Sequence, residues 1–294
     1  KYLLKSFYED SEIIYSVWTM DGEFLWQKKL GNARYFTLFF SPDSEILVES
    51  DSKSGKYSLY NTLDGSLLEQ FAFGQNVHEM IFSPNGKAVA VIVGLGKNTL
   101  QYYSWPERNL LSTFTNDTEI EVPKFSQDGS TLAYREAGRR MEVRETTDWK
   151  IIADVSLSRL YVYDIYHFSH ELSPDGTILA VKSRTPSNVE SFKTIGEPAI
   201  DVWKIGDSQP LLSIPGSEFT VSPDGKRIVV ISNGKLQTWD IESGQLIAEK
   251  INSHHYMQFS PNSSLLAVDI GGAQIAIFDV AEGKIKNILG EQET

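Results

Sequence analysis

Short, almost unbroken runs of apolar residues recur along the chain. They span residues 46–48, 88–93, 132–134, 178–181, 228–231 and 265–268. A strand with one face in water alternates apolar and polar positions, whereas these runs are almost unbroken. We therefore predict short strands that are covered on both faces.

Each apolar run follows the same turn-forming phrase. The phrase consists of an apolar residue, Ser, usually Pro, then Asp or Asn, and often Gly. Pro presets the first central φ of a type I turn, Asp or Asn suits the next position, and Gly accepts the positive φ that follows. The phrase serines are Ser41, Ser83, Ser126, Ser173, Ser222 and Ser260, at intervals of 42, 43, 47, 49 and 38 residues. We expect a hairpin turn at each copy.

A second hairpin signal lies between the copies, where a strand, most often ending in an aromatic residue, is followed by a turn-rich stretch. The seven examples lie at 18–22, 60–65, 105–108, 144–148, 203–207, 239–244 and 278–283. Two hairpins in each period of ~40 residues correspond to four strands, the unit of a β-propeller blade. The chain is thus predicted to be an all-β, seven-bladed propeller of four-stranded antiparallel blades.

We predict a single domain, residues 1–294, made of the seven blades. Their approximate ranges are 1–31, 32–72, 73–116, 117–156, 157–215, 216–251 and 252–290. The first range holds strands at 2–7, 13–18 and 24–30 but no Ser-Pro-Asp turn before them. We expect its innermost strand to lie upstream of Lys1, in a longer polypeptide whose other domains are candidate partners.

The repeats resemble the WD-repeat family of seven-bladed propellers in a divergent form. The Ser-Pro-Asp-Gly turns carry the resemblance over nearly the whole chain, and Trp239-Asp240 keeps the dipeptide that names the family. The Gly-His pair that opens a typical repeat is absent. The resemblance implies a rigid scaffold for protein or peptide binding, without catalysis.

Composition narrows the range of partners. The 27 Lys and Arg against 39 Asp and Glu give a net charge of −12, which disfavours binding to nucleic-acid phosphates. There is no Cys, so disulfides and thiolate metal sites are excluded. The apolar runs fall far short of the ~20 residues of a membrane helix, so no membrane insertion is expected.

Two insertions interrupt the regular spacing and define the predicted binding face. One extends the link at 156–169, and the other forms a loop at about 185–198 between the second and third strands of the same blade. In an up-and-down blade these two links emerge on one side, beside the short loop of the preceding blade. The predicted binding residues are Arg135, Arg139, Arg140, Tyr161, Tyr163, Tyr166, His167, Phe168, Arg184, Phe192 and Lys193.

This patch is aromatic and basic, as the cores of protein interfaces often are. An alternative is that Tyr161-Val162-Tyr163 forms an extra edge strand whose rings pack on the blade. We expect a protein or peptide partner and no cofactor.

A second class of function remains open from the sequence, namely an enzyme or metal-binding propeller of lactonase-like or TolB/peptidase-associated type. Its candidates are polar residues near the starts of innermost strands: His78, Glu79, His170, Glu171, Glu218 and His255. Such side chains could hold a metal, but their offsets from the phrase Ser differ. No Walker loop, dinucleotide fingerprint or Gly-x-Ser-x-Gly elbow is present.

Overall fold

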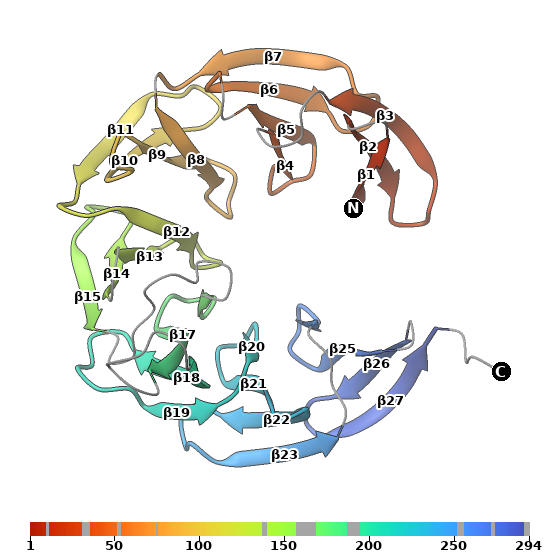
Figure 1. Ribbon diagram of the computed structural model, residues 1–294, viewed down its shortest axis with the longest axis vertical. Helices are drawn as coiled ribbons and strands as arrows, with labels where there is room; N and C mark the ends of the chain where they lie inside the picture. Colours follow the sequence, from red (N-terminus) through yellow and green to blue (C-terminus); the bar gives the residue numbers. More distant parts are fainter. Residues whose placement is uncertain are drawn as a thin grey trace. The chain divides into compact units, whose positions relative to one another are not determined.

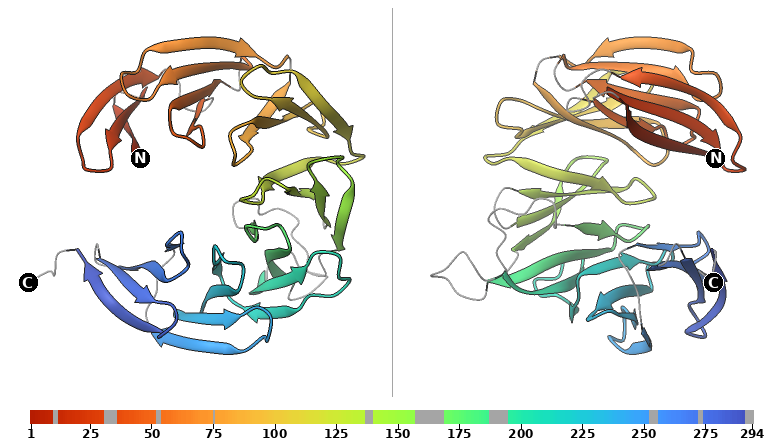
Figure 2. Two further views of the ribbon diagram at one scale, coloured as in Figure 1. Left: turned by 180° about the vertical axis from the view of Figure 1, so that it is seen from behind. Right: turned by 45° about the vertical axis from the view of Figure 1, so that its right-hand side comes forward.

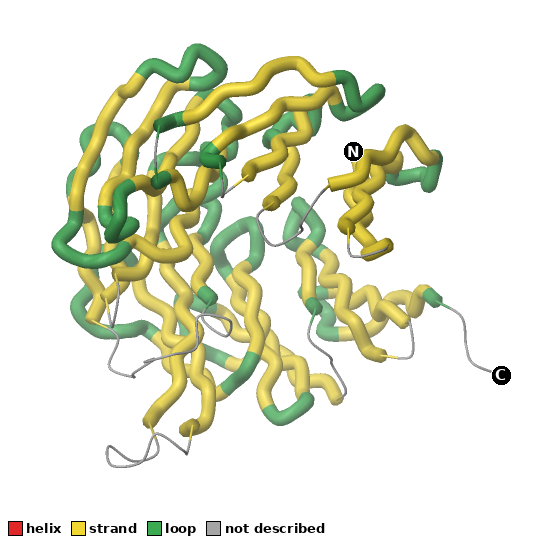
Figure 3. Tube along the Cα trace, turned by 45° about the horizontal axis from the view of Figure 1, so that its top comes forward, coloured by secondary structure: helices red, strands yellow, loops and turns green. Residues whose placement is uncertain are grey.

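The computed structural model describes the chain as two compact units, residues 1–120 and 121–294. The described residues are 1–9, 12–30, 36–51, 54–74, 76–136, 140–156, 169–186, 195–251, 256–271 and 274–290. Within these ranges every regular element is a β-strand, and Figure 3 accordingly shows only strand and loop. The strands form seven antiparallel sheets, which we number 1 to 7 in chain order (Figure 1).

The first unit contains sheets 1 to 3, and each strand pairs with its neighbours in the sequence. Sheet 1 consists of β1 (Tyr2–Glu9), β2 (Glu12–Thr19) and β3 (Phe24–Leu30). Sheet 2 consists of β4 (Phe36–Phe40), β5 (Ile46–Asp51), β6 (Lys56–Asn61) and β7 (Leu67–Ala72). Sheet 3 consists of β8 (Val77–Phe82), β9 (Ala88–Val93), β10 (Thr99–Ser104) and β11 (Leu110–Thr115).

The second unit contains sheets 4 to 7. Sheet 4 is β12 (Ile120–Phe125), β13 (Thr131–Glu136), β14 (Arg140–Glu145) and β15 (Ile151–Ser156). Sheet 5 is β16 (His170–Leu172), β17 (Ile178–Pro186), β18 (Ile195–Lys204) and β19 (Leu212–Pro215). Sheet 6 is β20 (Glu218–Val221), β21 (Arg227–Ser232), β22 (Lys235–Asp240) and β23 (Leu246–Ile251), and sheet 7 is β24 (Met257–Phe259), β25 (Leu265–Gly271), β26 (Gln274–Asp279) and β27 (Lys284–Leu289).

The predicted unit of four antiparallel strands is present in six sheets, and the sheet nearest the N-terminus has three. In the first unit β1 pairs with β2 and with no other described strand. The second hairpin turn follows β2 in sheet 1 and β6 in sheet 2, so β1 is the counterpart of β5. The other edge of β5 pairs with β4. Among the described residues, the position equivalent to β4 is therefore empty in sheet 1, as the sequence predicted.

Buried side chains pack between neighbouring sheets inside each unit. In the first unit one core joins sheets 1 and 2 around Tyr15 and Leu47, and another joins sheets 2 and 3. In the second unit three cores join sheets 4 with 5, 5 with 6 and 6 with 7. Figure 2 shows the strands of each sheet from two further sides.

The predicted two-sided burial holds for most of the apolar runs. Strand β9 is buried along almost its whole length, as are the runs in β13, β17 and β21. Strand β25 differs, because Leu266 and Val268 are buried while Leu265 and Ala267 are partly exposed. In the second unit its buried face packs toward sheet 6, and no described neighbour in that unit covers the other face.

The phrase serine closes each hairpin turn with its side chain. Ser173 Oγ donates to Asp175 Oδ1 at 2.6 Å and accepts the N–H of Ile178 at 2.9 Å. The Ser173 backbone N–H in turn donates to the Ile178 carbonyl at 2.9 Å. Equivalent side-chain hydrogen bonds occur at Ser41, Ser83, Ser126, Ser222 and Ser260. The hydroxyl thus satisfies a buried N–H and orients the turn carboxylate or amide.

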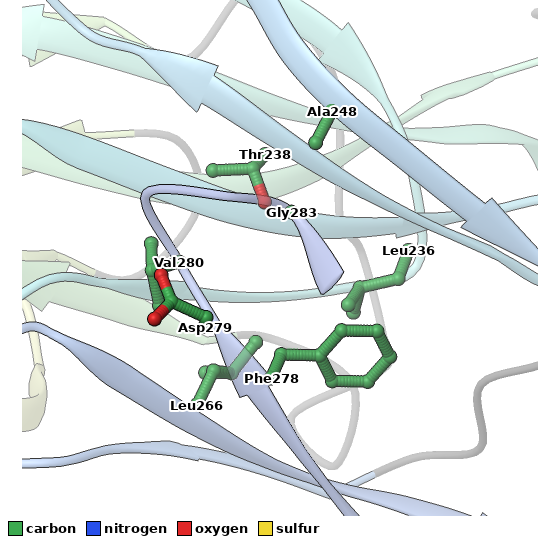
Figure 4. Close-up of a pocket in the computed structure, with 8 residues that line it drawn as sticks. All are labelled: Leu236, Thr238, Ala248, Leu266, Phe278, Asp279, Val280 and Gly283. Carbon is green, nitrogen blue, oxygen red and sulfur yellow. The ribbon is translucent and has the colours of Figure 1, made fainter. Parts of the chain in front are cut away.

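The second hairpin turn of a sheet packs against the outermost strand of the sheet before it. Gly65 has a φ of 69°, and a Cβ there would lie 2.6 Å from the Trp26 ring on β3. Gly283 makes the same approach to Ala248 on β23, and Figure 4 shows both residues. Only a residue without a side chain allows the backbone so close.

Candidate binding site

Both long segments attach at one end of sheet 5, which we call its insertion end. Strand β15 ends at Ser156 and β16 begins at His170, which pairs with Val181. Strand β17 runs on past Val181 to Pro186, where it pairs with Ile195 at the start of β18. Segments 157–168 and 187–194 therefore leave the sheet from the same end, as the strand order predicted. The opposite end carries the Ser173 turn, and we call it the turn end.

The loop predicted at 185–198 is shorter than expected. Residues 185–186 belong to β17 and residues 195–198 to β18, and Arg184 pairs with Pro198 in the ladder between them. Pro198 has no N–H, but a ladder of nine and ten residues tolerates one missing donor. The hairpin of sheet 5 is accordingly longer than its six-residue counterparts β13 and β14.

Most of the predicted binding residues lie outside the described ranges, and this part of the prediction stays untested. They are Arg139, Tyr161, Tyr163, Tyr166, His167, Phe168, Phe192 and Lys193. Arg184 lies on β17, where the backbone alone is described. Arg135 and Arg140 are the predicted residues whose side chains the structure describes.

Arg135 lies on β13 rather than in the short loop, and its side chain is buried. Its Nε donates to Glu121 Oε2 at 2.6 Å, and its Nη2 lies 2.5 Å from the same oxygen. This pair joins β12 to β13. The Arg135 guanidinium is therefore paired inside sheet 4.

Arg140 begins β14 and is exposed, with its charge also paired. Its Nε donates to Asp154 Oδ1 at 2.6 Å, its Nη2 contacts Asp154 Oδ2, and Glu136 lies 3.6 Å from Nη1. The hydrogen bonds with Asp154 raise the pKa of the Arg140 guanidinium. Arg135 and Arg140 lie on neighbouring strands, and the two guanidiniums have separate acidic partners.

Strand β16, which follows the first long segment, is tied to sheet 4 through its first residue. Lys124 on β12 donates from Nζ to the His170 carbonyl at 2.9 Å. The His170 side chain is 0% exposed, and burial, followed by the Lys124 and Arg135 charges, lowers its pKa to about 3. His170 is therefore neutral near pH 7 and packs as part of the interior.

Two further contacts tie sheet 5 to sheet 6. Glu171 Oε2 accepts the N–H of Val221 at 2.8 Å, and burial raises the pKa of this carboxyl group. Lys182 on β17 has a side chain only 7% exposed, and its Nζ lies 3.2 Å from Glu218 Oε1 on β20. The strands from which the long segments leave are thus anchored to both neighbouring sheets.

Sequence reasoning missed Lys124 and Lys182, although one signal for Lys182 was available. Lys182 stands nine residues after Ser173, and Arg135 stands nine residues after Ser126. Both are buried bases on the second strand of their sheet, and each pairs with a Glu on an innermost strand. An alignment of the repeats on the phrase serine would have placed the two bases together.

The described residues that were candidates for a metal site do not form a cluster of ligands. His78 and Glu79 are both exposed, and His78 Nε2 donates to the Gly94 carbonyl at 2.8 Å. His255 lies outside the described ranges. Within those ranges no three His, Cys, Asp or Glu side chains are grouped so as to hold a metal ion. The same ranges contain no helix of the length and apolarity needed to cross a membrane.

Comparison with known proteins adds no assignment. No protein-family model matches the chain, and no curated protein is similar to it at a significant level.

Proposed function

We propose that the seven sheets are the blades of a seven-bladed β-propeller of divergent WD-repeat type. In this proposal the chain is a non-catalytic module that binds a protein or peptide partner through the insertion end of sheet 5. The observation that carries the proposal is that both long segments attach to this one end, on strands tied to sheets 4 and 6.

The corresponding links of the other sheets are much shorter. The links between the second and third strands span 52–55, 94–98, 137–139, 233–234 and 272–273, against 187–194 in sheet 5. The links between consecutive four-stranded sheets span 73–76, 116–119, 216–217 and 252–256, against 157–169. Long loops on a rigid scaffold are where binding residues concentrate.

The residue types of the two segments support binding to a protein surface. Tyr161, Tyr163, Tyr166 and Phe168 in the first segment offer large contact areas, and Phe192 adds another in the second. The bases Arg139, Arg184 and Lys193 would meet acidic groups of the partner. A chain of net charge −12 otherwise repels such groups, so this basic set favours one orientation of approach.

Affinity capture with shortened variants tests the binding face. One variant replaces 157–168 with Gly-Ser-Gly, and a second replaces 187–194 with Asn-Gly, a pair that closes a tight hairpin. A control variant carries Ser208→Ala and Gln209→Ala, which are exposed at the turn end of the same sheet. We expect the intact protein and the control to retain the same partner and both shortened variants to lose it.

Binding of the captured partner is then measured with purified proteins by calorimetry. Loss of affinity in the shortened variants, with an unchanged circular dichroism spectrum, supports the proposed face. Full affinity in both shortened variants would show that another surface binds. To test the non-catalytic part, elemental analysis and thermal melts with and without chelator should show no bound metal and no shift in Tm.

A further inference from the structure

Strand β1 has one edge that no described strand covers. It pairs with β2 over all eight of its residues, and within the part of the chain that the structure describes its other edge is open (Figure 1). The Met20 N–H donates to the Lys1 carbonyl on the β2 side at 3.3 Å. Because backbone groups alternate between the two edges of a strand, the N–H and C=O groups of Tyr2, Leu4 and Ser6 point to the open edge.

This open edge lacks the features that usually keep a sheet edge from pairing. Strand β1 contains no Pro and a single Lys, and its ladder with β2 runs without a bulge. By contrast, the outermost strands β3, β7, β11, β15, β23 and β27 each have a register shift in their ladder. Bulges, Pro and charged residues are means by which proteins prevent an edge from adding a further strand. The regular edge of β1 is therefore suited to pair with another strand.

Strands β1 and β5 hold the same place relative to the second hairpin turn. On β6 the last aromatic residue before this turn is Tyr60, which pairs with Leu47. On β2 it is Trp18, which pairs with Leu3. Leu3 is thus the equivalent of Leu47, and β1 can be compared with β5 residue by residue. Sheet 2 therefore shows how a strand would lie along β1.

Strand β4 fills this place in sheet 2, and the phrase serine follows it directly. The Ser41 N–H donates to the Ile46 carbonyl at 2.9 Å, and Ser41 Oγ accepts the Ile46 N–H at 3.0 Å. Ile46 precedes Leu47, so its equivalent on β1 is Tyr2. A strand on β1 that ended in the same phrase would hydrogen-bond its serine to both backbone groups of Tyr2.

The side chains along β1 also leave room for a further strand. Leu4 is partly exposed, whereas its equivalent Val48 is 0% exposed and pairs with Phe39 on β4. Tyr2 and Leu4 face sheet 2, where the centre of the Tyr2 ring lies 6.3 Å from that of Phe40. In an added strand, the residue two before the serine would pair with Leu4 and lie against sheet 2. We expect that residue to be apolar.

We propose that the open edge of β1 binds an extended segment of a protein partner, antiparallel to β1, in which two apolar residues precede Ser-Pro and then Asp or Asn. All six phrase segments of the chain already belong to their own sheets, so this strand would come from another molecule. Main-chain hydrogen bonds would supply affinity, and the serine and the apolar residue before it specificity. This binding involves sheet 1 alone and does not depend on the function proposed for sheet 5.

A synthetic peptide with the sequence of residues 77–87 tests the edge, since it carries the phrase at Ser83 and Ile81 two residues before it. The peptide is titrated into the isotopically labelled 294-residue chain, and the backbone amides are followed by NMR. We expect saturable shifts and slower hydrogen exchange at the amides of the open edge. A peptide with Ser83→Ala should bind about fivefold more weakly, as expected for loss of a hydrogen bond between neutral groups.

Two N-methylated peptides provide a matched comparison. Methylation of the Ile81 nitrogen removes the N–H that would donate to the Leu4 carbonyl, whereas methylation of the Phe82 nitrogen alters the edge that points away from β1. The first change should weaken binding about tenfold or more, and the second should have little effect. On the chain, Tyr2→Pro removes the N–H offered to the serine and leaves the ladder with β2 intact. It should weaken binding more than Tyr2→Ala, which keeps that N–H.

Two other occupants of the edge give different results. If a second copy of the chain pairs with β1, the chain alone forms a dimer in sedimentation velocity, and the peptide dissociates it. If a segment before Lys1 in a longer polypeptide fills the place, that polypeptide binds no peptide, and its open-edge amides are already protected from exchange. Either result overturns the proposal, as does equal binding of the two N-methylated peptides or the absence of a saturable shift at the open edge.

Discussion

The guanidinium of Arg108 donates hydrogen bonds to both carboxylate oxygens of Glu69, at 3.1 and 2.6 Å. It also lies 4.4 Å from the centre of the Phe71 ring on the same strand, β7. Arg108 has a φ of 58° and occupies the turn position that is glycine at Gly65. Where Gly65 lets the backbone approach the preceding sheet, Arg108 reaches it with a side chain.

Two substitutions of Arg108 can separate the contribution of these contacts to stability from the cost of the backbone conformation. Arg108→Ala should destabilise the protein by about 1 kcal/mol, since a partly exposed ion pair and a cation–π contact are each worth less than that. Arg108→Gly loses the same contacts but relieves the left-handed strain, so it should be the more stable variant. Urea unfolding of both variants measures the difference. Equal stability would mean that the positive φ carries no cost at this turn.

The phrase serine should contribute more to the stability of the protein than the small size of its side chain indicates. Ser173→Ala removes the acceptor of two backbone N–H groups, from Thr177 at 3.1 Å and from Ile178 at 2.9 Å. Because Ser173 is fully buried, we expect a loss of about 1–3 kcal/mol in the free energy of unfolding. Ser66→Ala is the control, since Ser66 makes the same contact with Asp64 at an exposed turn. A comparable loss in both variants would refute the role of burial.

Acid should destabilise the turns through their aspartates. The Ser41 hydroxyl lowers the pKa of Asp43, while at Asp175 and Asp224 burial raises the pKa but hydrogen bonds outweigh it. A folded-state pKa below the unfolded value of about 3.9 stabilises the protein above that pH. The stability is lost as the pH falls below about 4, through the folded pKa values.

Asparagine variants can separate the effect of the carboxylate charge on stability from the effect of the turn structure. Asn85 already holds the equivalent place in sheet 3, where Ser83 Oγ donates to its Oδ1 at 2.8 Å. Asp175→Asn and Asp224→Asn should therefore keep the fold and make Tm less sensitive to pH between 5 and 2. An unchanged acid dependence in the double variant would mean that other groups control it.

The ion pair of Lys182 and Glu218 should respond unequally to removal of its two members. Lys182 is 7% exposed and Glu218 is 34% exposed. Glu218→Ala leaves a buried ammonium group without its carboxylate, and a loss of about 3 kcal/mol is expected. Lys182→Met leaves Glu218 able to reach water and should be much milder. Thermal and urea unfolding of both variants check this order, and a reversed order would contradict it.

The fold was largely predictable because its strands depend on local patterns. The residues after each phrase serine, usually Pro, then Asp or Asn and often Gly, favour a turn through local backbone preferences. An apolar run identifies a strand without knowledge of its neighbours. The spacing of the two kinds of turn was sufficient to predict four strands to a sheet. The half-exposed face of β25 was not predictable, because its sequence is as apolar as that of β21.

The site was less predictable because pairing depends on strands far apart in the sequence. Arg135 and Arg140 appear in the sequence as a basic cluster, yet Glu121 and Asp154, each 14 residues away, neutralise them. Lys182 was hidden in an apolar strand, and its partner Glu218 lies 36 residues further on.

The extra length of strand β17 has a consequence for the proposed binding at sheet 5. Strand β13 ends at Glu136, one residue after Arg135, whereas β17 continues to Pro186, four residues after the equivalent Lys182. At about 3.3 Å for each residue, the three additional residues extend the hairpin roughly 10 Å beyond its counterpart in sheet 4. Among the described residues at this end, the hairpin of β17 and β18 therefore projects beyond the ends of β13 and β14. For the proposed function, this projection favours a partner with a concave surface, or a slender segment that lies alongside the hairpin.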